Sequence, residues 1–202
     1  MNIGIDIDDT LTNTYELAFN YAEEYTVNEL KKEIQYVNRE RIRNRFTQNF
    51  HGWSEEEDRA FWDKYYEIIV KNVRIKPFAK EVIDKLRDEG DCIYFITARH
   101  ISEKFDIEEV TRTWLKKHEI EYEGIYLNIS DKAKIIKNNN IDFFIDDNIT
   151  NCLNVLETGI KTCIMDGLIN CNFYNEKIER IYSWPHLYQV ISRYKKEIGG
   201  SK

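Results

Sequence analysis

The stretch MNIGIDIDDTLT, residues 1–12, decides the fold, because three carboxylates cluster there within and directly after an apolar run. Ile3 to Ile7 have the length and composition of a buried strand. In an open α/β sheet, ligands collect at the carboxyl ends of the strands, where Asp6, Asp8 and Asp9 would lie. If the strand stays regular, Asp6 and Asp8 share one face. The alternative interpretation is an acidic turn after an edge strand.

Further apolar runs predict strands at Cys92 to Ile96, Phe143 to Ile145 and Thr162 to Met165. Helical patterns separate them, over residues 77–90, 131–139 and 150–157. Residues 180–194 predict a last strand followed by a final helix, with Pro185 in its first turn. This alternation predicts the α/β class, with a Rossmann-like parallel sheet covered by helices on both faces.

Residues 14–75 interrupt this rhythm, because they hold charged and aromatic residues at helical spacing and no clear strand. We interpret them as an inserted helical lobe, with residues 1–13 and 76–202 forming the α/β core. The clearest helix of the lobe begins at Ser54, with Glu57 completing a capping box. Residues 31–46 are charged enough to predict a solvated helix or a mobile segment.

The composition limits the function classes. The 202 residues suit one buried core, and 42% of them are hydrophobic. A formal net charge of −7 argues against binding of a nucleic-acid polymer, because affinity for the phosphate backbone comes from Lys and Arg. The four cysteines lack metal-site spacing, and we expect them to be reduced packing residues. No apolar leader or membrane-length stretch is found, so we expect a soluble, cytoplasmic protein.

A second acidic pair, Asp146 and Asp147, ends the apolar run in FFIDDN, residues 143–148. Carboxylates at two strand ends of a parallel sheet can face each other across a cleft. Such a site suits Mg²⁺, a hard cation held by carboxylates, waters and a substrate phosphate. The alternative is that Asp147 or Asn148 caps the helix that follows.

Three further residues can assist phosphate chemistry. Thr97 ends the strand in CIYFITARH, where a hydroxyl can hydrogen-bond a phosphoryl oxygen. Lys132 precedes Asp146 by fourteen residues and can offset the clustered negative charge; Lys134 and Lys137 are its rivals. Arg99 can reach the lobe or a substrate, or it can form a surface salt bridge.

The order of these motifs resembles the haloacid-dehalogenase superfamily of phosphohydrolases. The chain is similar within it to the 5'(3')-deoxyribonucleotidase family, through IDIDDTL, the helical insertion, TAR, and DKAK leading into FFIDDN. The resemblance implies a fold in which the insertion, between the first and second motifs, is an α-helical cap that closes over the substrate.

The resemblance also implies roles for the residues. Asp6 is the expected nucleophile that forms an aspartyl phosphate, and Asp8 the expected general acid and base. Mg²⁺ is expected to be bound by Asp6, the backbone carbonyl of Asp8, and the pair Asp146 and Asp147, which the sequence does not rank. Thr97 and Lys132 are the expected catalytic residues that hold the phosphoryl group and the nucleophile in place. Asp8, Thr97 and Lys132 are the expected contacts to the substrate, and Arg99, two residues after Thr97, is a further candidate contact by its position.

We therefore predict a Mg²⁺-dependent phosphomonoesterase acting on nucleoside or deoxynucleoside monophosphates. Another phosphatase of the same superfamily, for a different small metabolite, would share every catalytic residue and differ in the cap. A catalytically silent phosphate- or nucleotide-binding protein is the third alternative. The sequence leaves the oligomeric state open, with a homodimer as one candidate. Four cap aromatics can stack on a base or form the lobe's own core: Phe50, Trp53, Phe61 and Trp62.

Overall fold

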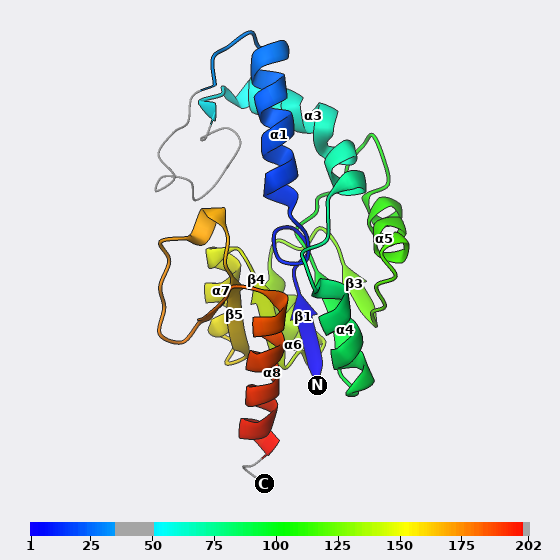
Figure 1. Ribbon diagram of the computed structural model, residues 1–202, viewed down its shortest axis with the longest axis vertical. Coiled ribbons are helices and arrows are strands. Elements are labelled where there is room, and N and C mark those ends of the chain that lie inside the picture. Colours follow the sequence, from blue (N-terminus) through cyan, green and yellow to red (C-terminus); the bar gives the residue numbers. More distant parts are fainter. Residues whose placement is uncertain (35–50, 200–202) are drawn as a thin grey trace.

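A single parallel sheet organises the computed structural model, which describes residues 1–34 and 51–199 (Figure 1). Its strands lie in the order β3-β2-β1-β4-β5-β6. In chain order the elements are β1 (Asn2–Ile5), α1 (Thr14–Asn28), α3 (Glu55–Asn72), α4 (Ala79–Asp88), β2 (Cys92–Ile96), α5 (Ile107–Lys117), β3 (Gly124–Tyr126), α6 (Lys132–Asn138), β4 (Phe143–Asp146), α7 (Ile149–Leu156), β5 (Lys161–Met165), the 3₁₀ turn η2 (Leu168–Asn170), β6 (Glu179–Ile181) and α8 (Trp184–Gly199).

Helices cover both faces of this sheet. Apolar side chains of α4, α5 and α8 join one face of the strands in a single buried cluster. On the other face, α6 and α7 contribute Ile136 and Val155 to a second cluster with strand residues such as Phe144. A Cβ at Gly4 would lie 3.1 Å from Ile141 and 3.2 Å from Phe144, so this strand position favours glycine. The predicted α/β sheet with two helical layers is confirmed.

The structure differs from the predictions most clearly at the end of the first strand and in two elements that the predictions omitted. β1 ends at Ile5 rather than Ile7, because the chain turns: the N–H groups of Leu11 and Thr12 both donate to the carbonyl of Ile7. Asp9 in this turn has a φ of 58°. The sequence interpretation also omitted the short strand β3 and the helix α5. β3 has only three residues, which is too short for a periodic signal.

The predicted helix ends are present. Gly90 and Gly159 follow α4 and α7 with φ of 89° and 84°, a conformation that glycine adopts without steric cost. Asn148, rather than Asp147, caps α7: its side chain accepts hydrogen bonds from the N–H groups of Thr150 and Asn151. Trp184 begins α8 and is buried, and its indole N–H donates to the carbonyl of Thr10 at 3.2 Å.

Helices α1 and α3 lie beyond the carboxyl edge of the sheet (Figure 1). Ser54 and Glu57 form the predicted capping box at the start of α3. The two helices share a buried cluster of their own, separate from the clusters on the sheet, that includes Tyr25, Trp53, Phe61 and Tyr65. The predicted solvated or mobile segment, residues 31–46, lies outside the described residues from residue 35 onward, as does Phe50.

The cysteines are free, and they differ in exposure. Cys152 and Cys163 are buried packing residues, and Cys92 is half-buried. Cys171 is exposed, so the expectation of a packing role was wrong for this residue, which lies in the irregular segment between β5 and β6. Within the described residues, no helix has both the length and the apolar character that crossing a membrane requires.

Candidate active site

A cleft of about 360 Å³ opens at the carboxyl ends of β1, β2 and β4, below α1 and α3. Parallel strands bring their ends to one edge of the sheet, so side chains that are far apart in sequence meet there. All the residues predicted for the site line this cleft: Asp6, Asp8, Thr97, Arg99, Lys132, Asp146 and Asp147.

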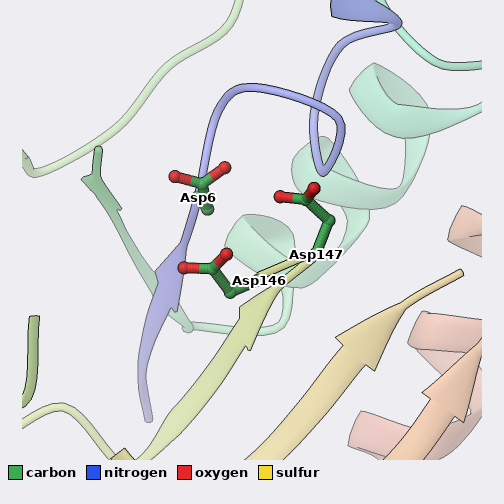
Figure 2. Close-up of side chains that lie close together, drawn as sticks. All are labelled: Asp6, Asp146 and Asp147. Carbon is green, nitrogen blue, oxygen red and sulfur yellow. The ribbon is translucent and has the colours of Figure 1, made fainter. Parts of the chain in front are cut away.

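Asp6, Asp146 and Asp147 bring three carboxylates together (Figure 2), with one oxygen of each within 4.8 Å of the others. All three residues are buried. Burial raises the pKa of Asp6 to about 7, with the charges of Asp146 and Asp8 adding to the effect and Lys132 opposing it. Burial and the charge of Asp146 also raise the pKa of Asp147 well above its usual range. With all three carboxylates ionised, the cluster would therefore hold more negative charge than Lys132 alone offsets.

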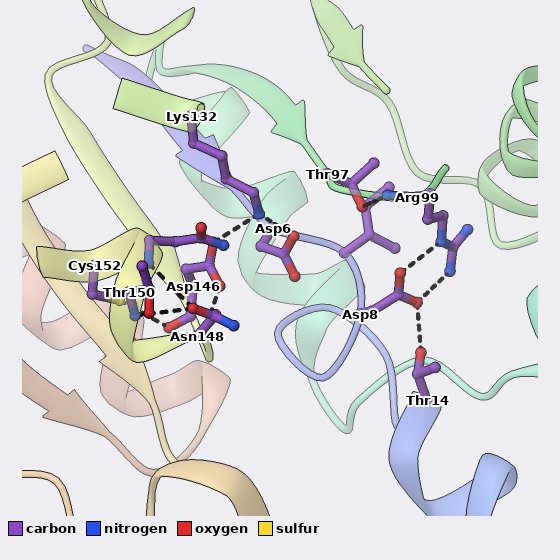
Figure 3. Close-up of polar contacts among 12 residues, drawn as sticks. Asp6, Asp8, Thr14, Thr97, Arg99, Lys132, Asp146, Asn148, Thr150 and Cys152 are labelled. Carbon is purple, nitrogen blue, oxygen red and sulfur yellow. Dashed lines mark hydrogen bonds and ion pairs between the residues drawn. The ribbon is translucent and has the colours of Figure 1, made fainter. Parts of the chain in front are cut away.

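Lys132 is the cation of this cluster (Figure 3). Its ammonium group donates to Asp6 and, at 2.7 Å, to Asp146. The side chain is buried at the first turn of α6, whereas its rivals Lys134 and Lys137 are exposed. Burial opposes the charge, but the two carboxylates outweigh it and raise the pKa of Lys132 above its usual range. Lys132 thus remains an ammonium group at neutral pH.

Asp146 and Asp147 differ in their hydrogen bonds. Asp146 accepts bonds from Lys132, from the Asn151 side chain at 2.9 Å, and from the N–H of Asn148 at 2.8 Å. By contrast, Oδ2 of Asp147 is buried and has no hydrogen-bond partner among the described residues. A buried carboxylate oxygen without a partner is costly unless a ligand contacts it. Hard carboxylate oxygens in this arrangement fit a divalent cation such as Mg²⁺.

The carboxylate of Asp8 points toward Arg99 and away from Asp146 (Figure 3). Arg99 forms a two-pronged contact with it, from Nε at 2.9 Å and Nη2 at 2.8 Å, and the Thr14 hydroxyl donates at 2.7 Å. Burial opposes ionisation, but Arg99 and Thr14 outweigh it and hold the pKa of Asp8 below its usual value. Because β1 ends at Ile5, the regular strand that would align Asp6 with Asp8 is absent.

Arg99 is a buried residue, so the alternative of a surface salt bridge was wrong. Its other terminal nitrogen donates to the Thr111 hydroxyl on α5 at 3.2 Å. Thr97 is also buried, and its hydroxyl accepts a hydrogen bond from the Arg99 N–H at 3.3 Å. Thr97, directly after β2, and the main chain of Arg99 are therefore joined by a hydrogen bond at the edge of the cleft.

The lobe contributes aromatic residues to the cleft, and they are only partly those expected. Trp53 and Phe61 are buried in the cluster between α1 and α3, whereas Trp62 and Tyr66 line the cleft. Tyr66 also stacks on His100 with ring centroids 4.3 Å apart, which joins α3 to the loop after β2.

The sequence of the whole chain resembles known nucleotidases. The family model described as 5' nucleotidase, deoxy (pyrimidine), cytosolic type C protein matches residues 1–197. The chain belongs to this family. It is a hydrolase of the phosphatase class, as the sequence motifs predicted.

Relatives of this nucleotidase-family protein support the assignment. A nucleotidase of Clostridium acetobutylicum is 29% identical over 197 residues, which cover 96% of this chain and 94% of the relative. A class B acid phosphatase of Marinomonas sp. is 28% identical over 148 residues, or 72% of this chain and 53% of the relative.

A solved structure shows the fold. The haloacid dehalogenase-like family hydrolase of Streptococcus pneumoniae has a TM-score of 0.64 and 18% sequence identity, and the match covers 96% of this chain and 97% of that one. The haloacid-dehalogenase fold predicted from the motif order is therefore confirmed.

Sequence reasoning about this nucleotidase-family protein missed three residues that contact the aspartates of the site. Thr14 contacts Asp8, Asn151 contacts Asp146, and Asn170 donates to the carbonyl of Asp147. Asn151 lies three residues after the Asn148 cap, a spacing that returns it to the same end of α7. Thr14 and Asn170 follow no motif spacing, and only the folded chain brings them to the site.

Proposed function

We propose that this protein is a Mg²⁺-dependent phosphomonoesterase that hydrolyses nucleoside or deoxynucleoside monophosphates through a phosphate ester on Asp6. The observation that carries the proposal is the position of Asp6, whose carboxylate contacts the Lys132 ammonium group and has one oxygen within 4.8 Å of an oxygen of Asp146 and of Asp147. Carboxylates act as nucleophiles when a positioned cation offsets the charge of the incoming phosphoryl group.

In the first step, a carboxylate oxygen of Asp6 attacks phosphorus and the bond to the leaving oxygen breaks. Asp8 gives its proton to that leaving oxygen, so a neutral nucleoside departs. In the second step, Asp8 takes a proton from a water molecule, whose oxygen attacks the aspartyl phosphate. Inorganic phosphate leaves, and the carboxylate of Asp6 and the protonated form of Asp8 are restored.

Arg99 favours the ionised form of Asp8, which is the form that the second step needs. The first step needs the protonated form. The negative charge of a bound phosphoryl group raises the pKa of a neighbouring carboxyl group, so substrate binding would favour protonation of Asp8. Arg99, committed to Asp8 by two hydrogen bonds, would act on the reaction through Asp8 as well as lining the substrate cleft.

Asp6 and Asp147 would hold Mg²⁺ directly, together with the backbone carbonyl of Asp8. The unpartnered Oδ2 of Asp147 supports it as the direct ligand of the acidic pair, since Asp146 already accepts three hydrogen bonds. When bound, the cation supplies positive charge to the Asp6 carboxylate and to the phosphoryl oxygens. Asp146 would then orient Lys132, and Lys132 and the Thr97 hydroxyl would bind the phosphoryl oxygens.

Residues 14–75 would form a cap over this cleft, because α1 and α3 have their own apolar cluster and contribute Tyr15, Trp62 and Tyr66 to the cleft wall. A closed cap excludes water and protects the intermediate. The family description names deoxy and pyrimidine nucleotides, which supports a nucleotide as substrate.

The class B acid phosphatase relative favours one alternative, a phosphatase of the same superfamily that acts on another small phosphorylated metabolite. It would use the same carboxylates with a different cap.

Phosphate release from a panel of nucleoside and deoxynucleoside monophosphates, with Mg²⁺ and with EDTA, tests the proposal. Wild type is compared with Asp6→Asn, which keeps the size of the side chain and removes the nucleophile. Magnesium-dependent release that the substitution abolishes is expected. Hydrolysis of aryl or sugar phosphates alone would favour a phosphatase for another small metabolite. Turnover by Asp6→Asn equal to that of wild type would refute the assignment of Asp6 as the nucleophile.

A further inference from the structure

The segment between β5 and β6, orange in Figure 1, contains a buried side-chain amide, that of Asn170, which contacts the main chain of Asp147 at the acidic site. Asn170, at the end of η2, is 1% exposed. Its Nδ2 donates to the carbonyl of Asp147 at 2.7 Å and to the carbonyl of Met165 at 2.8 Å. Its Oδ1 accepts from the N–H of Gly167 at 3.2 Å and from Arg180 at 2.7 Å. The amide is therefore used on both its donor and its acceptor side.

These four contacts define the orientation of the amide. Two partners are carbonyl oxygens, which only accept, and two are N–H groups, which only donate, so a flipped amide would lose all four hydrogen bonds. Asp147 directly follows the end of β4, and Met165 is the last residue of β5. One side chain thus ties the carboxyl ends of two neighbouring strands together at the residue that carries the unpartnered carboxylate oxygen.

Arg180 on β6 contacts both the Asn170 side chain and the main chain of the segment that carries it. Its Nη2 donates to the carbonyls of Asn170 and Phe173, at 2.8 and 2.5 Å, and its Nη1 forms an ion pair with Asp166 at 2.7 Å. A guanidinium group has five donors in a rigid plane, so it can join several acceptors without turning. The connection from Arg180 through Asn170 to Asp147 runs from β6, through the segment after β5, to the residue that follows β4.

We propose that Asn170 is a positioning residue for the metal site, which fixes the main chain of Asp147 and so the direction of its carboxylate, and that Arg180 secures Asn170 in this role. Neither side chain lines the cleft, so neither contacts substrate. The inference rests on the proposed function, because it requires Asp147 to bind the divalent cation. Groups that orient a metal ligand change metal affinity by about 10- to 100-fold when removed.

The test measures Mg²⁺ binding directly, by calorimetry on the full chain, for wild type, Asn170→Ala, Arg180→Met and Asp166→Asn. Asp166→Asn is the matched control, because it breaks the partly exposed ion pair of Arg180 and leaves the contacts to Asn170 in place. We expect Kd for Mg²⁺ to rise roughly tenfold or more in Asn170→Ala, less in Arg180→Met, and to stay near the wild-type value in Asp166→Asn.

Turnover provides a second readout that loss of stability alone would not give. At saturating Mg²⁺, the kcat of Asn170→Ala should return to within a few-fold of wild type while the Mg²⁺ concentration for half-maximal rate stays raised. Circular dichroism and the Tm in EDTA report folding. Wild-type affinity in both Asn170→Ala and Arg180→Met would overturn the inference, as would failure of both to fold, which would make the network a requirement for folding.

Failure of the proposed function gives a different result. If wild type itself does not bind Mg²⁺, the metal site is refuted and the role of Asn170 falls with it. If wild type binds Mg²⁺ and all variants bind it equally, the metal site stands and only the positioning role is refuted.

Discussion

Asp6 and Asp8 are two residues apart, yet their carboxylates have opposite surroundings. Asp6 contacts Lys132 within a cluster of carboxylates, and its pKa is raised to about 7. Asp8 contacts Arg99 and Thr14, and its pKa is lowered. Two titratable groups whose surroundings shift their pKa values apart are suited to different roles in one reaction. At the residue scale, the difference between the two pKa values therefore comes from burial among carboxylates for Asp6 and from the Arg99 and Thr14 contacts for Asp8.

Replacing Arg99 tests its action through Asp8. Arg99→Met removes the group that orients Asp8, so kcat should fall by roughly 100-fold while KM changes little, because general acid and base catalysis contributes about 10²–10⁴. Arg99→Lys should recover part of the rate, since one ammonium group replaces a two-pronged contact. Steady-state kinetics on the best nucleotide measures both constants.

The control for Arg99 is Lys104→Met, which removes an exposed cation of the same loop. Wild-type kcat in Arg99→Met would contradict the role through Asp8. A raised KM with unchanged kcat would instead make Arg99 a substrate contact only.

The raised pKa of Asp6 predicts how metal binding depends on pH. In the metal-free protein, folded Asp6 keeps a proton that the unfolded chain has lost, so its contribution to stability declines as pH rises from 3.8 to about 7. A divalent cation requires the ionised carboxylate and offsets this loss. The increase in Tm caused by Mg²⁺ should therefore be larger at about pH 8 than at about pH 5.5.

Differential scanning fluorimetry in Mg²⁺ and in EDTA measures this increase. In Asp6→Asn, which has no proton to lose at that position, the pH dependence should weaken. An increase in Tm that is equal at both pH values in wild type would contradict a site that includes Asp6.

At the element scale, helix starts hold the site. Lys132 is the first residue of α6, and Asn148 caps α7 while its N–H binds Asp146. The start of α3 in the lobe is also fixed by a cap. The Ser54 hydroxyl accepts a hydrogen bond from the Glu57 N–H at 3.2 Å, and the Glu57 carboxylate accepts one from the Ser54 N–H at 2.9 Å. The caps fix the residue at which each helix begins, and this places Lys132 and the Asn148 N–H beside Asp146.

Loss of the Ser54 cap should destabilise the protein. Ser54→Ala leaves the N–H of Glu57 without its side-chain partner, and we expect the free energy of unfolding to fall by about 1 kcal/mol, a typical value for an N-cap. Urea unfolding monitored by circular dichroism measures it. Ser130→Ala, at an exposed serine outside the helices, is the control and should change stability little. Equal stability of the two variants would show that the capping box contributes nothing.

At the scale of the whole molecule, charge and cleft size limit the substrate. The net charge is −7, and both buried cations of the cleft, Lys132 and Arg99, already pair with carboxylates. Within the described part of the chain, neither buried cation of the cleft is therefore free to bind the backbone of a polymer. The cleft, at about 360 Å³, is at the small end of the range for ligand pockets and suits one small molecule.

Oligonucleotides should accordingly be neither substrates nor strong inhibitors. A phosphorylated single-stranded DNA added at the concentration of a good mononucleotide substrate should release no phosphate and should leave its turnover unchanged, because binding of such polymers depends on phosphate contacts. Phosphate release with and without the oligonucleotide measures both effects. Competitive inhibition that weakens with salt would contradict this expectation.

The sequence by itself determined the α/β class, the sheet except β3, the helical layers except α5, and the family of the protein. Apolar runs, helix stop signals and the DxDDT and DD motifs are local, and local pattern is enough for such features. Position 132 was selected over positions 134 and 137 by motif order, and the fold buries only that lysine of the three beside Asp6.

Only the tertiary structure decided which partners each aspartate contacts. The contacts of Asp8 with Arg99, of Asp146 with Lys132 and Asn151, and of Asn170 with Asp147 join segments that no periodicity relates. The proposed ranking of Asp147 over Asp146 as the metal ligand rests on those contacts and on the unpartnered Oδ2 of Asp147. The physical reason is that pKa values and unpartnered atoms depend on burial and on neighbours across the fold, which chain spacing does not specify.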